Sequence, residues 1–111
     1  MILDVSVPLA QFTNGFEITF EHVSGYVIVG KSEPNIVIRD GDIFKVRGEG
    51  LPNQYQQRGD LFIRFNNSNQ DGVIYGNKID LIYGMPCETR IRYVMAEKVD
   101  EIPQGEQCVH Q

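Results

Sequence analysis

The last four residues of the chain are Cys108-Val109-His110-Gln111, and they form the motif with the most direct chemical consequence. A cysteine followed by two residues and a final residue has the C-a-a-X form of a prenylation signal, and glutamine in the last position favours a farnesyl group on Cys108. His110 departs from the aliphatic residue usual at its position. The alternative is an incidental terminal cysteine, and the motif by itself leaves both interpretations open.

The other potentially reactive side chains form no recognisable site. The two cysteines, Cys87 and Cys108, include no CxxC pair. We expect no secretion signal before them, because Asp4 and Pro8 interrupt the apolar N-terminal stretch. We therefore expect free thiols and no zinc site. His22 has no serine or cysteine nucleophile at a motif spacing, so we expect it to lie on the surface or in a turn.

Two acidic residues, Asp40 and Asp42, flank Gly41 and resemble a fragment of a calcium-binding loop. No acidic residue closes the loop at the position that calcium ligation requires, so we interpret both as turn formers. The sequence also supplies no catalytic triad and no set of metal ligands. We expect a protein that is not an enzyme and needs no cofactor.

The length and the composition of the chain favour a small β-rich domain. A chain of 111 residues fits one domain, or one domain with an appendage. β-Branched and aromatic residues and turn-forming glycines are frequent, which is typical of sheets. A formal net charge of −5 argues against a nucleic-acid-binding protein.

Alternating apolar and polar residues predict the strands. The expected strands are Ile2–Val7, Phe16–Glu21, Tyr26–Val29, Ile43–Val46 and Leu61–Phe65. The second and third form the strongest predicted hairpin. One helical turn is expected within Leu9–Asn14, where Leu9 and Phe12 share a face.

The pattern weakens after residue 66. Ile79 and Ile82 stand at helical spacing, so the sequence predicts a short helix over Lys78–Tyr83. Residues Thr89–Met95 alternate again, as in a final strand or an extended arm. We divide the chain into a β-domain (1–66), a linker and appendage (67–99), and a disordered tail (100–111) that lacks periodicity.

The chain is organised around a strand end and turn, Val46-Arg47-Gly48-Glu49-Gly50-Leu51-Pro52, followed by Arg58-Gly59-Asp60-Leu61-Phe62-Ile63-Arg64-Phe65. Gly48 and Gly50 tolerate positive φ, and Pro52 cannot continue a central strand. The pattern predicts a β-hairpin with a long connection.

These two blocks resemble the R-G-x-G-[ML]-P turn and the [RK]-G-D-L-[YF]-[IV] strand in the last β-domain of DnaJ-type (heat-shock-40) co-chaperones. The run Gly15–Gly25 is similar to the family's G-F, strand, [LV]-x-G signature, and the ordered match covers Leu3 to Phe65. Eukaryotic members with a zinc domain often end in a similar C-[AV]-H-Q tail, which favours farnesylation of Cys108.

The resemblance implies a mainly β fold: a small β-sandwich with one short helix, plus a short C-terminal helix or extended arm. It implies a module that binds unfolded client polypeptides, forms a homodimer through the appendage and supports the seventy-kilodalton heat-shock chaperone. That chaperone would engage other parts of the full-length protein, since the His-Pro-Asp tripeptide of a J-domain and the zinc-binding repeats are absent. We expect a cytoplasmic protein, with weak membrane association if Cys108 is prenylated.

Two sets of residues are candidates for these contacts. A client groove would be lined by Phe16, Ile18, Phe20, Tyr26 and Ile28, whereas the alternative makes them the core face of the hairpin. A dimer contact would involve Ile79, Ile82, Tyr83 and Met85, and the alternative is an intrachain cap. A different class of protein, a carbohydrate-binding β-sandwich, would need clustered aromatic residues, but the five tyrosines are scattered along the sequence.

Overall fold

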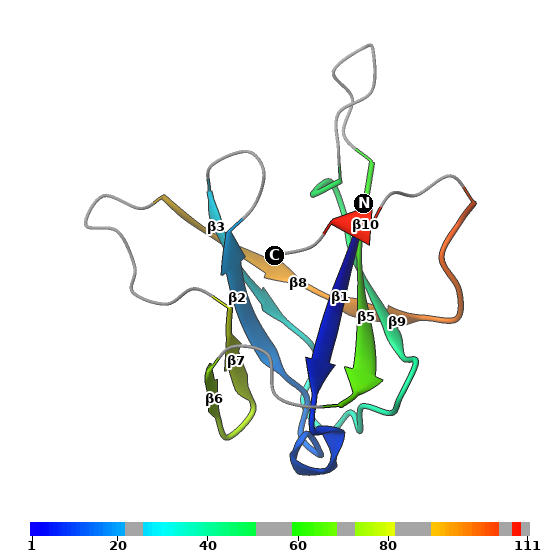
Figure 1. The fold of residues 1–111 in the computed structure, drawn as a ribbon. Helices are drawn as coiled ribbons and strands as arrows, with labels where there is room; N and C mark the ends of the chain where they lie inside the picture. The colour runs from blue at the N-terminus through cyan, green and yellow to red at the C-terminus, as the bar shows by residue number, and fades with distance from the viewer. Residues whose placement is uncertain (22–25, 51–58, 69–72, 82–89, 105–107, 110–111) are drawn as a thin grey trace.

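Two five-stranded mixed sheets face each other as a small sandwich in the computed structural model (Figure 1). The structure describes residues 1–21, 26–50, 59–68, 73–81, 90–104 and 108–109. The mainly β fold predicted from the sequence is confirmed. The single helical turn is also confirmed, as the 3-10 helix η1 (Leu9–Gln11).

The strand order of each sheet departs from the order in the sequence. The first sheet has the order β10-β1-β5-β4-β9, formed by Cys108–Val109, Ile2–Val7, Leu61–Asn67, Ile43–Val46 and Glu97–Val99. The second sheet has the order β6-β7-β2-β3-β8, formed by Val73–Tyr75, Lys78–Asp80, Glu17–Glu21, Val27–Lys31 and Ile91–Met95. Each sheet therefore combines the N-terminal part of the chain with its C-terminal part.

The predicted alternation places apolar side chains between the sheets. In β1, Leu3, Val5 and Val7 are buried while Asp4 and Ser6 are partly exposed. Three phenylalanines from different segments, Phe16, Phe44 and Phe65, pack edge-to-face with ring centroids 4.8–5.6 Å apart. Edge-to-face aromatic pairs add about 0.5–1.5 kcal/mol beyond the burial of their area.

The motif glycines build the hairpin between β4 and β5, which pair antiparallel as predicted. Gly48 takes φ +74°, and its N–H donates to Asp60 Oδ1 at 3.1 Å. Gly50 has no positive φ, contrary to our expectation, and serves instead as a site of close approach. Its N–H donates to the carbonyl of Gly59 at 3.0 Å, and a Cβ there would lie 2.6 Å from the Asp60 carbonyl oxygen. Residues 51–58 lie outside the described part of the chain.

The acidic residues around Gly41 are turn formers, as predicted. The Asp42 N–H donates to the Arg39 carbonyl at 3.0 Å, and Asp42 Oδ2 accepts from the Arg39 N–H at 2.8 Å. Asp40 Oδ1 accepts from the backbone N–H of Asn67 at 2.8 Å. Both carboxylates thus stabilise the backbone around the turn.

The C-terminal part of the chain differs from the prediction in two ways. Residues Lys78–Asp80 form strand β7, which pairs parallel with β2, so the helix predicted here is wrong for these residues. A three-residue hydrophobic spacing is compatible with either element, and pairing with β2 decides in favour of the strand. Within the expected disordered tail, Cys108–Val109 forms β10 and pairs parallel with β1.

The close approach at Gly50 leads to a stability prediction. A Gly50→Ala substitution forces the new methyl group against the backbone of Gly59 and Asp60, and we expect a loss of about 1–3 kcal/mol in the free energy of unfolding. Gly59→Ala is the matched control, because a Cβ at Gly59 meets nothing within 4 Å. Urea denaturation of both variants tests this, and equal stabilities would contradict the role assigned to Gly50.

Candidate functional site

Most of the residues expected to line a client groove lie inside the sandwich. Phe16, Ile18, Phe20 and Ile28 are buried in the core cluster, and Tyr26 is the one member that is partly exposed. Side chains of this set pack against the first sheet, since edge-to-face contacts join Phe16 to Phe44 in β4 and to Phe65 in β5. A ligand cannot reach the four buried side chains while the two sheets remain packed.

The residues expected at a dimer contact divide between the core and the part of the chain that is not described. Ile79 is buried and pairs with Ile18 across β7 and β2. Ile82, Tyr83 and Met85 lie outside the described residues, as do His22 and Cys87. Cys108 pairs with Ile2 through the backbone of β10.

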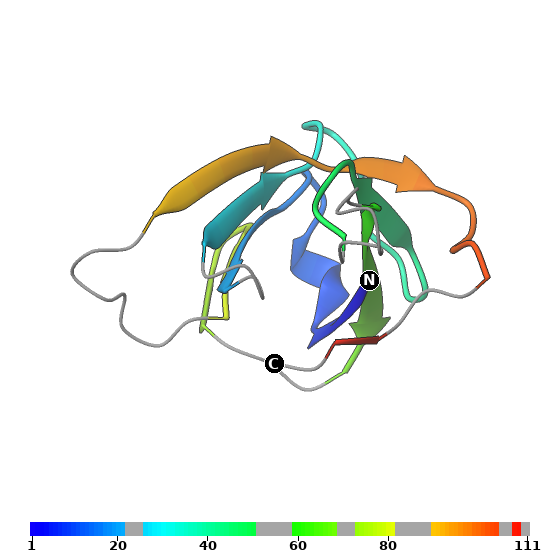
Figure 2. The ribbon, with the colours of Figure 1, turned by 90° about the horizontal axis from the view of Figure 1, so that it is seen from above.

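One segment, residues 91–99, passes from the second sheet to the first, and we call it the crossing segment. Its strand β8 pairs parallel with β3, and its strand β9 pairs antiparallel with β4. Between them Ala96 is buried, and its N–H donates to the Lys31 carbonyl at 2.7 Å. Figure 2 shows the two strands as one band along a side of the sandwich. The crossing segment therefore forms the outer edge of both sheets.

The outward face of β8 carries an apolar stripe. Ile91, Tyr93 and Met95 are 41%, 74% and 63% exposed, and we call these three residues the β8 stripe. The alternation in the sequence predicted that these three side chains share one face of a strand, and an apolar face of a strand normally packs against the core. In the structure the other face of the crossing segment packs inward: Val94 packs against the core and Ala96 is buried.

A hydrogen-bonded ion pair links the inward face of β8 to the turn that follows β4. Arg92 Nη1 donates to Glu49 Oε1 at 2.7 Å, and the Glu49 side chain is only 5% exposed. This hydrogen bond raises the pKa of Arg92. The Arg92 guanidinium also lies 4.5 Å from the ring centroid of Tyr26, within cation–π distance. No signal in the sequence linked Arg92 to Glu49, because the two residues are far apart in the chain.

A second arginine contacts the hydroxyl group of Tyr26. Arg90 Nη1 donates to the Tyr26 oxygen at 3.4 Å, and this hydrogen bond with the adjacent positive charges lowers the pKa of Tyr26. Tyr26 thus connects the start of β3 to the start of β8. We assign it to the support of the crossing segment rather than to an open groove.

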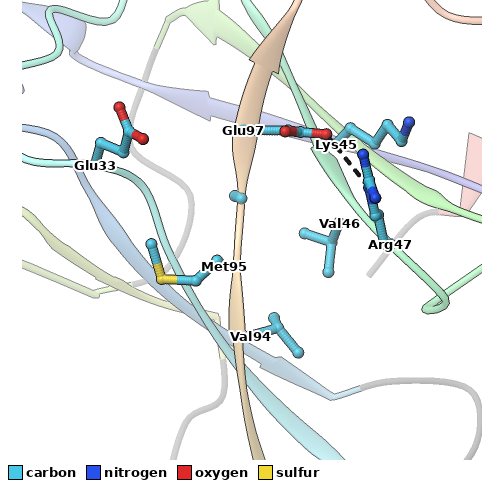
Figure 3. Close-up of a pocket in the computed structure, with 8 residues that line it drawn as sticks. Glu33, Lys45, Val46, Arg47, Val94, Met95 and Glu97 are labelled. Atoms are coloured by element: carbon cyan, nitrogen blue, oxygen red, sulfur yellow. Dashed lines mark ion pairs between the residues drawn. The ribbon is translucent and has the colours of Figure 1, made fainter.

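A pocket of about 530 Å³ opens where the crossing segment passes β4 (Figure 3). It is lined by Glu33, Lys45, Val46, Arg47, Val94, Met95, Ala96 and Glu97. Its accessible apolar surface comes from Met95, which is 63% exposed, and from the partly buried Val94, because Val46 and Ala96 are only 1% and 2% exposed. Two acidic and two basic residues stand around it, with Arg47 and Glu97 paired at 3.6 Å. Such a pocket suits an apolar side chain of a peptide whose backbone and neighbours are polar.

The accessible features of the described residues are binding surfaces. Among them, no group of three or more histidine, cysteine, aspartate or glutamate side chains is placed to hold a metal ion. No helix in the described part is long and apolar enough to span a membrane. The pocket and the β8 stripe are the apolar features that remain accessible around the crossing segment.

Comparison with known proteins places the N-terminal part of the chain in a family. The family described as DnaJ C terminal domain matches residues 1–68. Over 63 residues the chain is 43% identical to DnaJ homolog subfamily A member 2 of Homo sapiens and of Bos taurus, and 41% identical to the Rattus norvegicus protein of that name. These matches cover 54% of this chain and 15% of each relative, so the chain corresponds to a small part of their length.

The hydrogen bond between Arg92 and Glu49 should stabilise the crossing segment. We expect Arg92→Met to lower the free energy of unfolding by about 1–3 kcal/mol, since it removes a charged partner from a buried carboxylate. Arg39→Met is the control and should change stability by less than about 0.5 kcal/mol, because Arg39 is exposed and lies outside the crossing segment. A double-mutant cycle with Glu49→Gln measures the coupling, and zero coupling would show that the pair contributes nothing.

Proposed function

The chain belongs to the DnaJ C-terminal domain family, and from this premise we propose that it is a client-binding and dimerisation module of a DnaJ-type co-chaperone. The family match over residues 1–68 is the observation that carries the proposal. The DnaJ co-chaperone family is not an enzyme family, in keeping with a role based on binding. Delivery of clients to the seventy-kilodalton heat-shock chaperone would require a J-domain, whose His-Pro-Asp tripeptide does not occur in this sequence.

Clients, in this proposal, are unfolded polypeptides that place an apolar side chain in the pocket beside the crossing segment. The accessible apolar side chains of Val94 and Met95 supply the attraction, and the surrounding charged residues suit the polar backbone of an extended chain. A single pocket binds weakly, so two linked copies would gain from their raised effective concentration. For this reason we include a homodimer in the proposed function.

We further propose that Cys108 is farnesylated and that the protein is mainly cytoplasmic. A single lipid chain gives only weak and reversible attachment to a membrane, so one fraction would associate with membranes while most remains in solution. The pairing of Cys108 with β1 extends over two residues, and so short a pairing opens readily to expose the tail.

Suppression of aggregation tests client binding. We expect the chain to slow the aggregation of a chemically denatured protein and to bind labelled apolar-rich peptides. The Val94→Thr variant should bind these peptides about 3–10-fold more weakly, because it places a hydroxyl group in the apolar part of the pocket. Val37→Thr is the matched control, since Val37 is 49% exposed and does not line the pocket. Peptide binding that is absent, or equal in both variants, would contradict the assignment.

Incubation with a protein farnesyltransferase and farnesyl diphosphate tests whether Cys108 accepts a farnesyl group. Mass spectrometry should show one farnesyl group added to the chain and none added to a Cys108→Ser variant. That variant retains Cys87, which controls for non-specific reaction of a thiol. Unmodified wild-type protein, under conditions that modify a known C-a-a-X peptide, would exclude Cys108 as a substrate.

A further inference from the structure

The pocket beside the crossing segment contains an accessible thioether, the side chain of Met95. Of the two methionines that the structure describes, Met1 is buried, whereas Met95 is 63% exposed. Figure 3 shows the Met95 side chain extending away from the backbone of the crossing segment. Small reagents in solution can therefore reach its sulfur atom.

The apolar attraction of the pocket depends on the same side chain. Val94 packs partly against the core, and Val46 and Ala96 are buried. The other residues that line the pocket are charged. An apolar side chain of a client therefore makes its apolar contacts chiefly with Met95. Methionine suits this role, because its unbranched and polarizable side chain adapts to partners of different shape.

We propose that Met95 is a site of reversible oxidation by peroxide, and that its oxidation lowers the affinity of the pocket for client polypeptides. The inference rests on the proposed client binding and adds a means of regulating it. A lone pair of Met95 Sδ attacks one oxygen of hydrogen peroxide, so that an S–O bond forms and the O–O bond breaks. The departing hydroxide takes the proton from the sulfur-bound oxygen and leaves as water. The sulfur is thereby oxidised to a sulfoxide, and the peroxide is reduced.

Oxidation changes the pocket where its apolar attraction is concentrated. A methionine sulfoxide is polar, and its oxygen accepts hydrogen bonds from water. An apolar client side chain would have to displace this water without replacing its hydrogen bonds, which weakens binding. The fold should remain intact, because Met95 is exposed while Val94 and Ala96 pack on the inward side of the crossing segment. Methionine sulfoxide reductases reverse the reaction, with one enzyme for each sulfoxide epimer.

Peptide mapping after exposure to hydrogen peroxide tests the site. Trypsin cleaves after Arg92 and Lys98, so the peptide Tyr93–Lys98 contains Met95 and no other methionine. We expect this peptide to gain one oxygen atom, and to lose it when the oxidised protein is treated with both methionine sulfoxide reductases. An unmodified Tyr93–Lys98 peptide, under conditions that oxidise a short synthetic methionine peptide, would overturn the inference.

Affinity for a labelled apolar-rich peptide tests the consequence of oxidation. We expect peroxide to weaken peptide binding by the wild-type chain about 3–10-fold, and the reductases to restore it. Met95→Leu has an apolar side chain without a thioether, so its dissociation constant should be the same before and after peroxide. Each protein is compared with itself, so the affinity of the untreated variant does not affect the result.

A second variant separates the thioether from the thiols of the chain. The double variant Cys87→Ser, Cys108→Ser keeps Met95, and peroxide should weaken its peptide binding by the same factor as in the wild type. Circular dichroism before and after peroxide verifies that each protein stays folded.

Two results of the binding experiment would overturn the inference and leave the proposed function in place. Unchanged affinity after complete oxidation of Met95 would show that clients do not depend on this side chain. An equal loss of affinity in the wild type and in Met95→Leu would assign the effect to another residue. Failure of the untreated chain to bind any peptide would instead contradict the proposed function, and the inference with it.

Discussion

The crossing segment is the constraint on which the rest of this structure depends, because it belongs to both sheets. Strand β8 extends the second sheet beyond β3, and strand β9 extends the first sheet beyond β4. Ala96 between them is buried and small enough for the chain to pass from one layer to the other. The hydrogen bond from Arg92 to Glu49 adds a polar link on the inward face. The positions of the pocket and of the exposed edge both follow from this segment.

Burial of aromatic side chains explains why the hairpin of β2 and β3 offers no open groove. All six phenylalanines of the chain are buried, and Phe16, Phe44 and Phe65 meet edge-to-face. A small domain buries a limited fraction of its surface, so it cannot leave its largest apolar residues exposed without losing stability. Accessible apolar contacts therefore lie at the periphery, in the pocket and on β8.

The proposed binding function uses surfaces around the crossing segment. The pocket lies where the crossing segment passes β4, and the β8 stripe lies on the outward face of the second sheet. Met95 belongs to both surfaces, whereas the Val94 side chain points to the opposite side of β8 from Met95 (Figure 3). Two linked copies, as in the proposed function, would present two pockets, and paired weak sites bind one long unfolded chain more tightly than either does alone.

The sequence by itself determined the local elements of the N-terminal two thirds of this protein. Alternation predicted β1, β2, β3, β4 and β5, and the glycines around Glu49 predicted a turn, because these signals act between residues close in the chain. Beyond residue 66 alternation also predicted the strand that β8 forms, and tertiary structure decided the rest. The short apolar spacing at Ile79 fits helix or strand, and pairing with β2 selected the strand. The stripe of Ile91, Tyr93 and Met95 has the alternation of a buried face, yet Ala96 and the contact between Arg92 and Glu49 turn it outward. Contacts between residues so distant in the chain leave no periodic signal, and for that reason only the folded chain shows which face of β8 meets solvent.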